Sequence, residues 1–353
     1  MKIRTAQELM QDNLIVKHKA GSHSYGTAIA TSDEDFRGIF VADAINVRTP
    51  FYSIKEAEDN SEEDTKHYEL ANYMKLCLDC NPNIIETLWV DRQDVIFATA
   101  EYDLLRSYRR DFLSSKVAFT TSGYALAQLK RIRGHNKWIN SPQPEKQPEP
   151  CDYISVVQWF GSEKNLNPDL KQYRNNFRLI PYGGDIFAVV HYKGMQLWDN
   201  KGNLNTNYEP GEDRSKLPSP LIIVKWNRDV FKVALEKWQQ YWTWKKERNK
   251  VRSELEEEFG YDTKHAMHLV RLLRMGKEAL ETGEINVRRP DAAELLSIRN
   301  GAWTYDELVK YAEDMDNEVT QVLYKTTSLP KAPNTELAAK VIMEVQDMIW
   351  SRK

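Results

Sequence analysis

The stretch "AGSHSYGTAIATSDEDFRGIF", residues 20–40, decides how the first part of this chain folds. The run "LIVKHKA" at 14–20 predicts a strand that ends at Gly21-Ser22, and "FRGIFVA" at 36–42 predicts a second strand. The sequence "HSYGTA" between them predicts a short helical turn or loop. Asp33 and Asp35 stand one residue apart, although aspartate is a poor strand former and like charges on one strand face repel. We therefore expect a positive group between the two carboxylates.

These residues suit one kind of chemistry. Alternate residues of a strand point the same way, so the carboxylates of Asp33 and Asp35 would face one spot about 7 Å apart along the backbone. Magnesium commonly takes one or two carboxylates together with substrate phosphates. The Gly21-Ser22 turn offers backbone N–H groups that suit a phosphate. A metal beside a phosphate indicates phosphoryl or nucleotidyl transfer by two metals, and the alternative is an acidic turn before a strand.

The composition describes an ordered globular protein. The chain has 353 residues, enough for two or three domains, with 41% hydrophobic and 29% charged residues. Its net charge of -3 excludes a basic field over the whole protein, so a nucleic-acid partner must be held by a local patch. The three cysteines, Cys77, Cys80 and Cys151, fit a reducing compartment, and Cys77-x-x-Cys80 lacks a second pair for a zinc site. Without a signal core or a membrane-length apolar run, we expect a cytoplasmic protein and no membrane partner.

Strands and helices alternate over the first 90 residues. A third strand is expected at 51–57, a strand that turns into a helix at 65–79, and a helix at 81–90, which indicates an α+β unit with helices on a small sheet. We place this unit at 1–98. Residues 99–226 are expected to hold a helical segment, a proline-rich linker and a β-containing insertion, and residues 227–353 a helical domain.

Cap and turn residues give the finer boundaries. In the insertion, 185–207 predicts a hairpin with Gly194 and Gly202 as turn residues. Capping boxes are expected at Thr5/Glu8 and Thr304/Glu307. The remaining helix signals are a C-cap at Gly260, an N-cap at Asp262 or Thr263, a stop at Gly283 and a last helix over 334–350.

The motif "GSHSYGTAIATSDEDFRG" at 21–38 resembles the signature of the DNA polymerase beta-like nucleotidyltransferase superfamily, in which an apolar strand, Gly-Ser, a spacer and Asp-x-Asp follow one another. The "SYGT…SD-D-RG" pattern is closer still to the predicted nucleotidyltransferase branch associated with RNA repair pathways. Further blocks resemble that branch: "DTKHYELANYMKL" at 64–76, "NPNIIETLW" at 81–89 and "GYDTKHAMHLVRLLRMGKEALETGEINV" at 260–287. The resemblance covers 15–90 and 227–310 well and 140–225 loosely.

The resemblance implies a fold and a site. The fold would be α+β, a polymerase beta-like palm core with a β-containing insertion and a C-terminal helical domain. Gly21 and Ser22 would hold a triphosphate, and Asp33 and Asp35 two Mg²⁺ ions, with Mn²⁺ as the alternative metal. The family's third carboxylate best matches Asp64, with Glu69 as the competitor. An acceptor hydroxyl would attack the α-phosphorus and pyrophosphate would leave.

The resemblance also implies partners. The acceptor would be an RNA end, such as that of a tRNA, and the nucleotide an NTP, with ATP or CTP preferred. One rival function is nucleotidylation of a protein hydroxyl by a toxin or regulator, and another is nucleotide binding without catalysis. The sequence shows no code that reads the base, and it leaves the oligomeric state open.

Several basic and aromatic groups have two interpretations each. Lys264, His268 and Arg271 recur at i, i+4 and i+7, either as a cationic wall toward triphosphate or RNA or as a solvated helix face. The basic segment 129–138 either grips nucleic acid or ends a helix favourably, and the second is preferred. The remaining expectations are structural ones: no metal pair at His265/His268, a capping role for Glu86, a motif carboxylate as the partner of Arg37, and helix packing for Trp238, Trp242 and Trp244.

Overall fold

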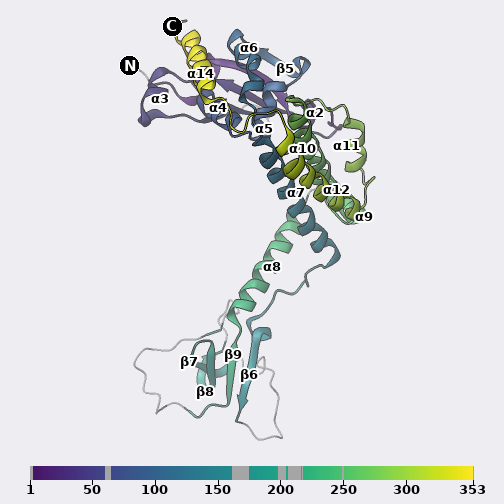
Figure 1. The fold of residues 1–353 in the computed structure, drawn as a ribbon. Helices are drawn as coiled ribbons and strands as arrows, with labels where there is room; N and C mark the ends of the chain where they lie inside the picture. The colour runs from purple at the N-terminus through teal and green to yellow at the C-terminus, as the bar shows by residue number, and fades with distance from the viewer. Residues whose placement is uncertain are drawn as a thin grey trace. The chain divides into compact units, whose positions relative to one another are not determined.

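The computed structural model describes residues 3–59, 65–160, 175–197, 204–205, 216, 218–248 and 250–352. The chain forms two compact units, one of residues 1–140 with 250–353 and one of residues 141–249 (Figure 1). The mixed α+β class expected from the sequence is confirmed. The division differs from the expected boundaries at 98 and 226, because helices on either side of residues 141–249 pack together in the first unit.

A five-stranded sheet organises the first unit. Its strand order is β3-β4-β2-β1-β5, in which β2 and β4 are parallel and the other neighbours antiparallel. The strands are β1 (Leu14–Ala20), β2 (Asp35–Phe40), β3 (Glu56–Asp59), β4 (Thr65–Glu69) and β5 (Val95–Ala98). The expected third strand at 51–57 is wrong in its first half. Pro50 starts a 3-10 turn, η1 (Pro50–Tyr52), since proline has no N–H to donate to a ladder, and β3 begins only at Glu56.

Gly38 sets how closely the central strands approach. A Cβ atom built on Gly38 would lie 2.4 Å from Cδ2 of His67 on β4 and 2.6 Å from the carbonyl oxygen of Val16 on β1. Residues on both neighbouring strands therefore occupy the space that any larger side chain would need.

Short helices surround this sheet. The expected capping box of Thr5 and Glu8 is confirmed at the start of α1. The block at 65–79 turns from β4 into α4 as expected, and α4 buries Tyr73 and Met74. The other short elements are α1 (Ala6–Asp12), α2 (Gly21–Tyr25), α3 (Ala44–Arg48), α4 (Leu70–Leu78), α5 (Pro82–Ile85), η2 (Glu86–Trp89), η3 (Arg92–Asp94), α6 (Ala100–Ser107) and η4 (Arg109–Phe112).

Two long helices, α7 (Val117–Asn140) and α10 (Thr263–Thr282), run side by side (Figure 1). Their close approach depends on Gly276, where a Cβ would lie 2.3 Å from Oγ1 of Thr121. The expected caps of α10 are confirmed: Asp262 accepts the His265 N–H, and Gly283 ends the helix with φ 69°. The capping box of Thr304 is confirmed on α12. The other elements here are α9 (Lys250–Phe259), α11 (Ala292–Arg299), α12 (Tyr305–Asn317), the π-helical η9 (Glu318–Leu323), α13 (Tyr324–Thr326) and α14 (Thr335–Trp350).

The second unit holds a four-stranded antiparallel sheet of order β6-β9-β8-β7. The expected turn at Gly194 is wrong, because this residue lies inside β8, and Gly202 lies outside the described residues. The β7–β8 turn falls instead at Gly183 and Gly184, whose φ angles of 111° and 57° suit glycine. The elements are η5 (Pro150–Tyr153), β6 (Ile154–Trp159), β7 (Asn175–Gly183), β8 (Ile186–Gln196), β9 (Ile222–Trp226) and α8 (Arg228–Glu247).

Within this unit, the indole N–H groups of Trp238 and Trp242 both donate to the carbonyl oxygen of Pro144, at 2.9 and 3.1 Å. The two rings also contact each other, with centroids 6.1 Å apart, which is compatible with the expected packing role. No helix in the described part of the chain is both long and apolar enough to cross a membrane.

Candidate active site

The motif residues meet at one edge of the first sheet. Strand β1 ends at Ala20, which pairs with Asp35 at the start of β2, and Phe36 pairs with Thr65 at the start of β4. The chain therefore leaves β1 into α2 at the same edge where β2 and β4 begin. This topology brings Gly21 beside Asp35 although they are fourteen positions apart in the sequence.

Gly21 and Asp35 approach each other closely. Gly21 has φ +60°, and a Cβ atom built on it would lie 2.3 Å from Oδ2 of the half-buried Asp35. Glycine is required twice over, by the left-handed backbone and by the carboxylate that occupies the space of a side chain. The Ser24 hydroxyl donates to the Gly21 carbonyl oxygen at 2.9 Å and holds the turn.

Asp33 lies just outside the ladder. We expected both aspartates on one strand, but β2 begins at Asp35, and Asp33 is exposed in the segment before it. Pairing between β1 and β2 reaches only to Asp35, the register partner of Ala20, where β1 ends. Glu34, between the two, forms a surface ion pair with Lys19 at 3.3 Å. The carboxylate oxygens of Asp33 and Asp35 are hard donors of the kind that Mg²⁺ takes.

The two candidates for a third carboxylate differ in position. Asp64 lies outside the described residues. Glu69 pairs in register with Phe40, five positions along β2 from Asp35, or about 17 Å by the rise of a strand. Its side chain is buried and accepts the N–H groups of Ala71 and Asn72 as the N-cap of α4. Glu69 is therefore committed to a helix end remote from Asp35.

Helix α10 contacts the end of α2, the helix that begins with Gly21 and Ser22, through Arg271. Its guanidinium carbon lies 3.6 Å from the ring centroid of Tyr25, and its Nη1 lies 3.3 Å from Oε2 of Glu86. The Tyr25 hydroxyl donates to the other oxygen of Glu86 at 2.5 Å. Arg271, Tyr25 and Glu86 are all buried. We expected Glu86 to cap a helix, but its carboxylate joins α10 to the end of α2 instead.

Burial dominates the electrostatics of this cluster. It raises the pKa of Glu86, although Arg271 and the Tyr25 hydroxyl oppose that shift, and it raises the pKa of Tyr25. Burial and then the Arg271 charge lower the pKa of His268 to about 3. His268 is therefore a neutral imidazole, which corrects its place in the expected cationic wall. Arg271 contacts other side chains of the protein, including that of His268. Lys264, two turns nearer the start of α10, has a half-buried side chain.

Residues 2–142 match the RNA repair pathway DNA polymerase beta family, RlaP. No curated protein and no solved structure matches the chain. The RlaP match confirms the resemblance to the RNA-repair-associated branch, and it covers Gly21, Asp33 and Asp35 together with the five-stranded sheet. A polymerase beta-like family implies nucleotidyl transfer in general, with nucleotides and nucleic acids as substrate classes.

The segment after α10 lies outside the RlaP match, yet it supports the same edge. Arg288 makes two hydrogen bonds to the carboxylate of Asp94, at 2.7 and 2.8 Å, just before β5. The Arg289 N–H donates to the Tyr25 carbonyl oxygen at 3.0 Å. Neither arginine of "NVRRP" was expected at the site, and the Arg289 contact has no side-chain signal because its donor is a backbone N–H. The C-terminal helices thus hold α2 from a second side.

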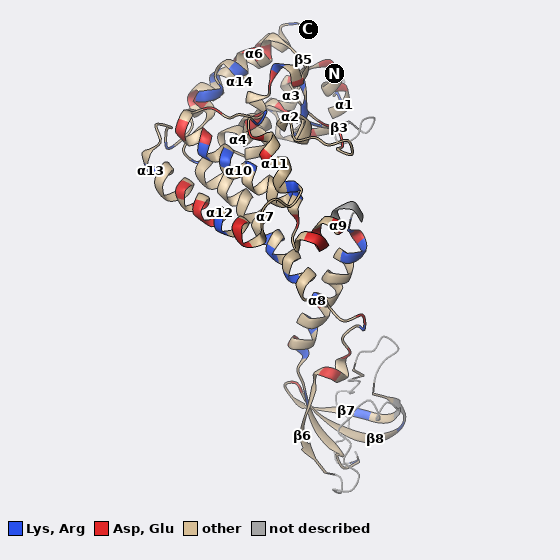
Figure 2. Cartoon of the chain, turned by 90° about the vertical axis from the view of Figure 1, so that its right-hand side faces the viewer, with Lys and Arg blue, Asp and Glu red and all other residues tan. Residues whose placement is uncertain are grey.

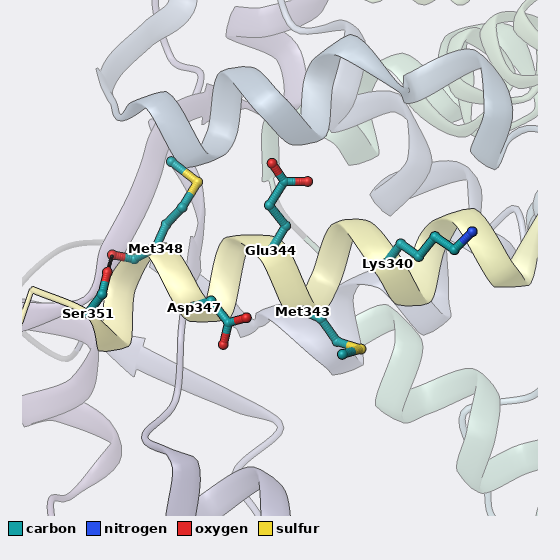
Figure 3. A pocket seen from close by; sticks show the side chains of 6 residues that line it. All are labelled: Lys340, Met343, Glu344, Asp347, Met348 and Ser351. Atoms are coloured by element: carbon teal, nitrogen blue, oxygen red, sulfur yellow. Dashed lines mark hydrogen bonds between the residues drawn. The ribbon is translucent and has the colours of Figure 1, made fainter.

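Outside the candidate site, the surface of the first unit carries mixed charge and a pocket on α14. Lys and Arg are interspersed with Asp and Glu along the helices of the first unit, in keeping with the net charge of -3 (Figure 2). A surface pocket lies on α14, where side chains from successive turns line it (Figure 3). All six residues that line it lie outside the RlaP match; they are Lys340, Met343, Glu344, Asp347, Met348 and Ser351.

Proposed function

We propose that the chain is a template-independent nucleotidyltransferase. It transfers an NMP from an NTP to an acceptor hydroxyl at an RNA end, such as that of a tRNA, and releases pyrophosphate. The observation that carries the proposal is the approach of Asp35 Oδ2 to Gly21, within the RlaP match, at the edge where three strands start or end. A carboxylate aimed at a side-chain-free turn is what a metal-bound triphosphate needs.

The proposed roles follow from these positions. Asp33, Asp35 and Asp64 hold Mg²⁺, which when bound neutralises triphosphate charge and favours loss of the acceptor's hydroxyl proton. Asp64 is preferred as the third ligand because it precedes Thr65, the register partner of Phe36, whereas Glu69 lies at the far end of β4.

Other residues bind and position the nucleotide. Gly21 and Ser22 admit the triphosphate, while Lys264 and the neutral His268 contact it from α10. Arg271 acts as a positioning residue, because its contacts run to Tyr25 at the end of the turn that carries Gly21 and Ser22. Catalysis then consists mostly of positioning and charge neutralisation.

A labelling assay tests the proposal. Purified protein is incubated with Mg²⁺ and each α-³²P-NTP in turn, with total RNA and total protein as acceptors. The inactive variant is Asp33→Asn/Asp35→Asn. Glu34→Gln is the matched control, since it removes the intervening exposed charge without touching a proposed ligand.

Label on RNA that persists in Glu34→Gln and disappears in the double variant supports end addition, and the preferred NTP identifies the nucleotide. Label on protein instead assigns the same chemistry to a protein acceptor. Absence of label with every NTP and acceptor, from protein that binds nucleotide, rejects catalysis and favours the binding function.

A further inference from the structure

A second group of side chains that could bind a metal lies outside the Gly-Ser and Asp-x-Asp motif at 21–38. It combines His135 of α7, Glu256 of α9 and Asp262, the N-cap of α10. One ligand atom from each lies within 4.8 Å of the other two. The His135 Nδ1 atom is 3.7 Å from Glu256 Oε1 and 3.5 Å from Asp262 Oδ2. The end of α7 therefore meets the α9–α10 connection, which is more than 100 positions away in the sequence, inside the first unit.

Two of the three side chains in this group are buried carboxylates. The side chains of Glu256 and Asp262 are only 6% and 4% exposed. Removing two neighbouring carboxylates from water is costly unless they are paired or coordinate a metal. His135, with 19% of its side chain exposed, is the third member and brings an imidazole nitrogen toward both.

The distances fit coordination better than direct contact. A charge-assisted N–H···O bond is about 2.7–2.9 Å long, shorter than either separation from His135. Zinc–nitrogen and zinc–oxygen bonds of about 2.0–2.2 Å in a tetrahedron place the ligand atoms about 3.3–3.6 Å apart. The His135–Asp262 separation of 3.5 Å lies in this range and that to Glu256 is slightly longer.

Neighbouring groups orient the three ligands. His265 Nδ1 lies 2.5 Å from Asp262 Oδ2, and the His265 backbone N–H donates to the other carboxylate oxygen at 3.0 Å. The Trp138 ring stacks on that of His135, with centroids 5.8 Å apart. Hydrogen-bonded carboxylates and fixed imidazole rings are typical of the groups around bound metals.

We infer that His135, Glu256 and Asp262 bind one divalent transition-metal ion, with Zn²⁺ the best match to one imidazole and two carboxylates. Water would take the fourth position on the exposed side of His135. The expectation of no metal pair at His265 and His268 concerned those two histidines and did not consider His135. The ion would join α7, which ends at Asn140 before residues 141–249, to α9, which begins just after them.

A protonated His135 is the competing way to balance the charge. Burial lowers the pKa of this imidazole, but Asp262 and Glu256 outweigh it and raise the pKa to about 9. Metal content therefore decides between the two. The test uses the full chain in the Asp33→Asn/Asp35→Asn background, so that zinc at the proposed nucleotide site is not counted and the result is independent of the proposed function.

The measurement is zinc per chain after dialysis, by mass spectrometry, together with Zn²⁺ affinity and the melting temperature with and without a chelator. Asp262→Asn is the decisive variant, because asparagine keeps the N-cap and loses the charged ligand. Glu258→Gln, an exposed neighbour on α9, is the matched control.

We expect one zinc ion per chain, a melting temperature lowered by the chelator, and unchanged binding in Glu258→Gln. Asp262→Asn should weaken Zn²⁺ binding by more than about 100-fold, because it removes a ligand. His265→Gln removes only a hydrogen-bond partner of a ligand, and we expect it to weaken binding by about 10- to 100-fold. Zinc-free protein that neither binds Zn²⁺ nor gains stability from it overturns the inference. The inference is also overturned if the Asp262→Asn variant binds Zn²⁺ as tightly as the protein that keeps Asp262.

Discussion

The guanidinium carbon of Arg271 lies 3.6 Å from the ring centroid of Tyr25, so the middle of α10 packs on the last residue of α2. The two residues are separated by most of the chain, and both contact the buried carboxylate of Glu86. This contact makes the geometry of the candidate site depend on a helix outside the RlaP match. Stability and activity should therefore be coupled through Arg271.

Replacing Arg271 by methionine should destabilise the protein by about 3–5 kcal/mol, because it leaves Glu86 buried without this cation. Adding Glu86→Gln should restore part of the loss, as measured by urea unfolding of the single and double variants. Lys277→Met on the same helix is the control, since its partly exposed pair with Glu318 is worth at most about 1 kcal/mol. If the free-energy losses of Arg271→Met and Glu86→Gln simply add in the double variant, the proposed interaction between Arg271 and Glu86 is contradicted.

Gly21→Ala should abolish nucleotidyl transfer, because the new Cβ would collide with Asp35 Oδ2. Gly26→Ala is a matched control: φ is +73° there, but a Cβ would meet its nearest neighbour, Nη1 of Arg288, at 3.6 Å. Both should cost about 1–2 kcal/mol for the left-handed backbone, and only Gly21→Ala should remove Mg²⁺-dependent activity. Equal loss of activity in the two would argue against a specific role for the Gly21 space.

Gly38→Ala should separate β2 from its neighbours, because its Cβ would meet both the His67 ring and the Val16 carbonyl oxygen. We expect a loss of about 3 kcal/mol or insoluble protein, measured by expression and thermal unfolding. Gly123→Ala, in α7 where a Cβ would meet nothing within 4 Å, should instead gain about 0.5–1 kcal/mol. A stable Gly38→Ala protein would refute the close packing of these strands.

The protein should lose stability in mild acid. Burial, opposed only by the Lys19 carbonyl contact, lowers the pKa of His18 to about 4, below its unfolded value near 6.5. The unfolded state then takes up the proton first, so stability is full above pH 6.5 and falls toward pH 4, by about 3 kcal/mol for this group. His268 adds to the effect in the same direction.

Chemical unfolding at pH 7.5 and 5 measures this loss. The variant His18→Gln carries no titrating ring and should show a smaller difference between the two pH values. A difference equal to that of the unsubstituted protein would assign the acid sensitivity to other groups.

The local elements were predictable because their signals are local. The strand at 14–20 ends at Gly21 as expected, and the caps of Thr5, Asp262 and Thr304 begin helices because each side chain bonds N–H groups within three residues of itself. The turn at Gly183-Gly184 was missed for the opposite reason. Gly183-Gly184 and Gly194 could each serve a hairpin turn, and the strand register decided which of them did.

From the sequence alone, the order of Gly-Ser, Asp33 and Asp35 determined the family resemblance, and the alternation of strand and helix patterns over the first 90 residues determined the α+β class, because both depend on spacing along the chain. Tertiary structure decided which charges are used and how. It placed Asp35 against Gly21, buried Arg271 on Tyr25 and Glu86, neutralised His268 and gathered His135, Glu256 and Asp262. Burial and partner distance control the state of an ionisable group, and both are properties of segments brought together only when the chain folds.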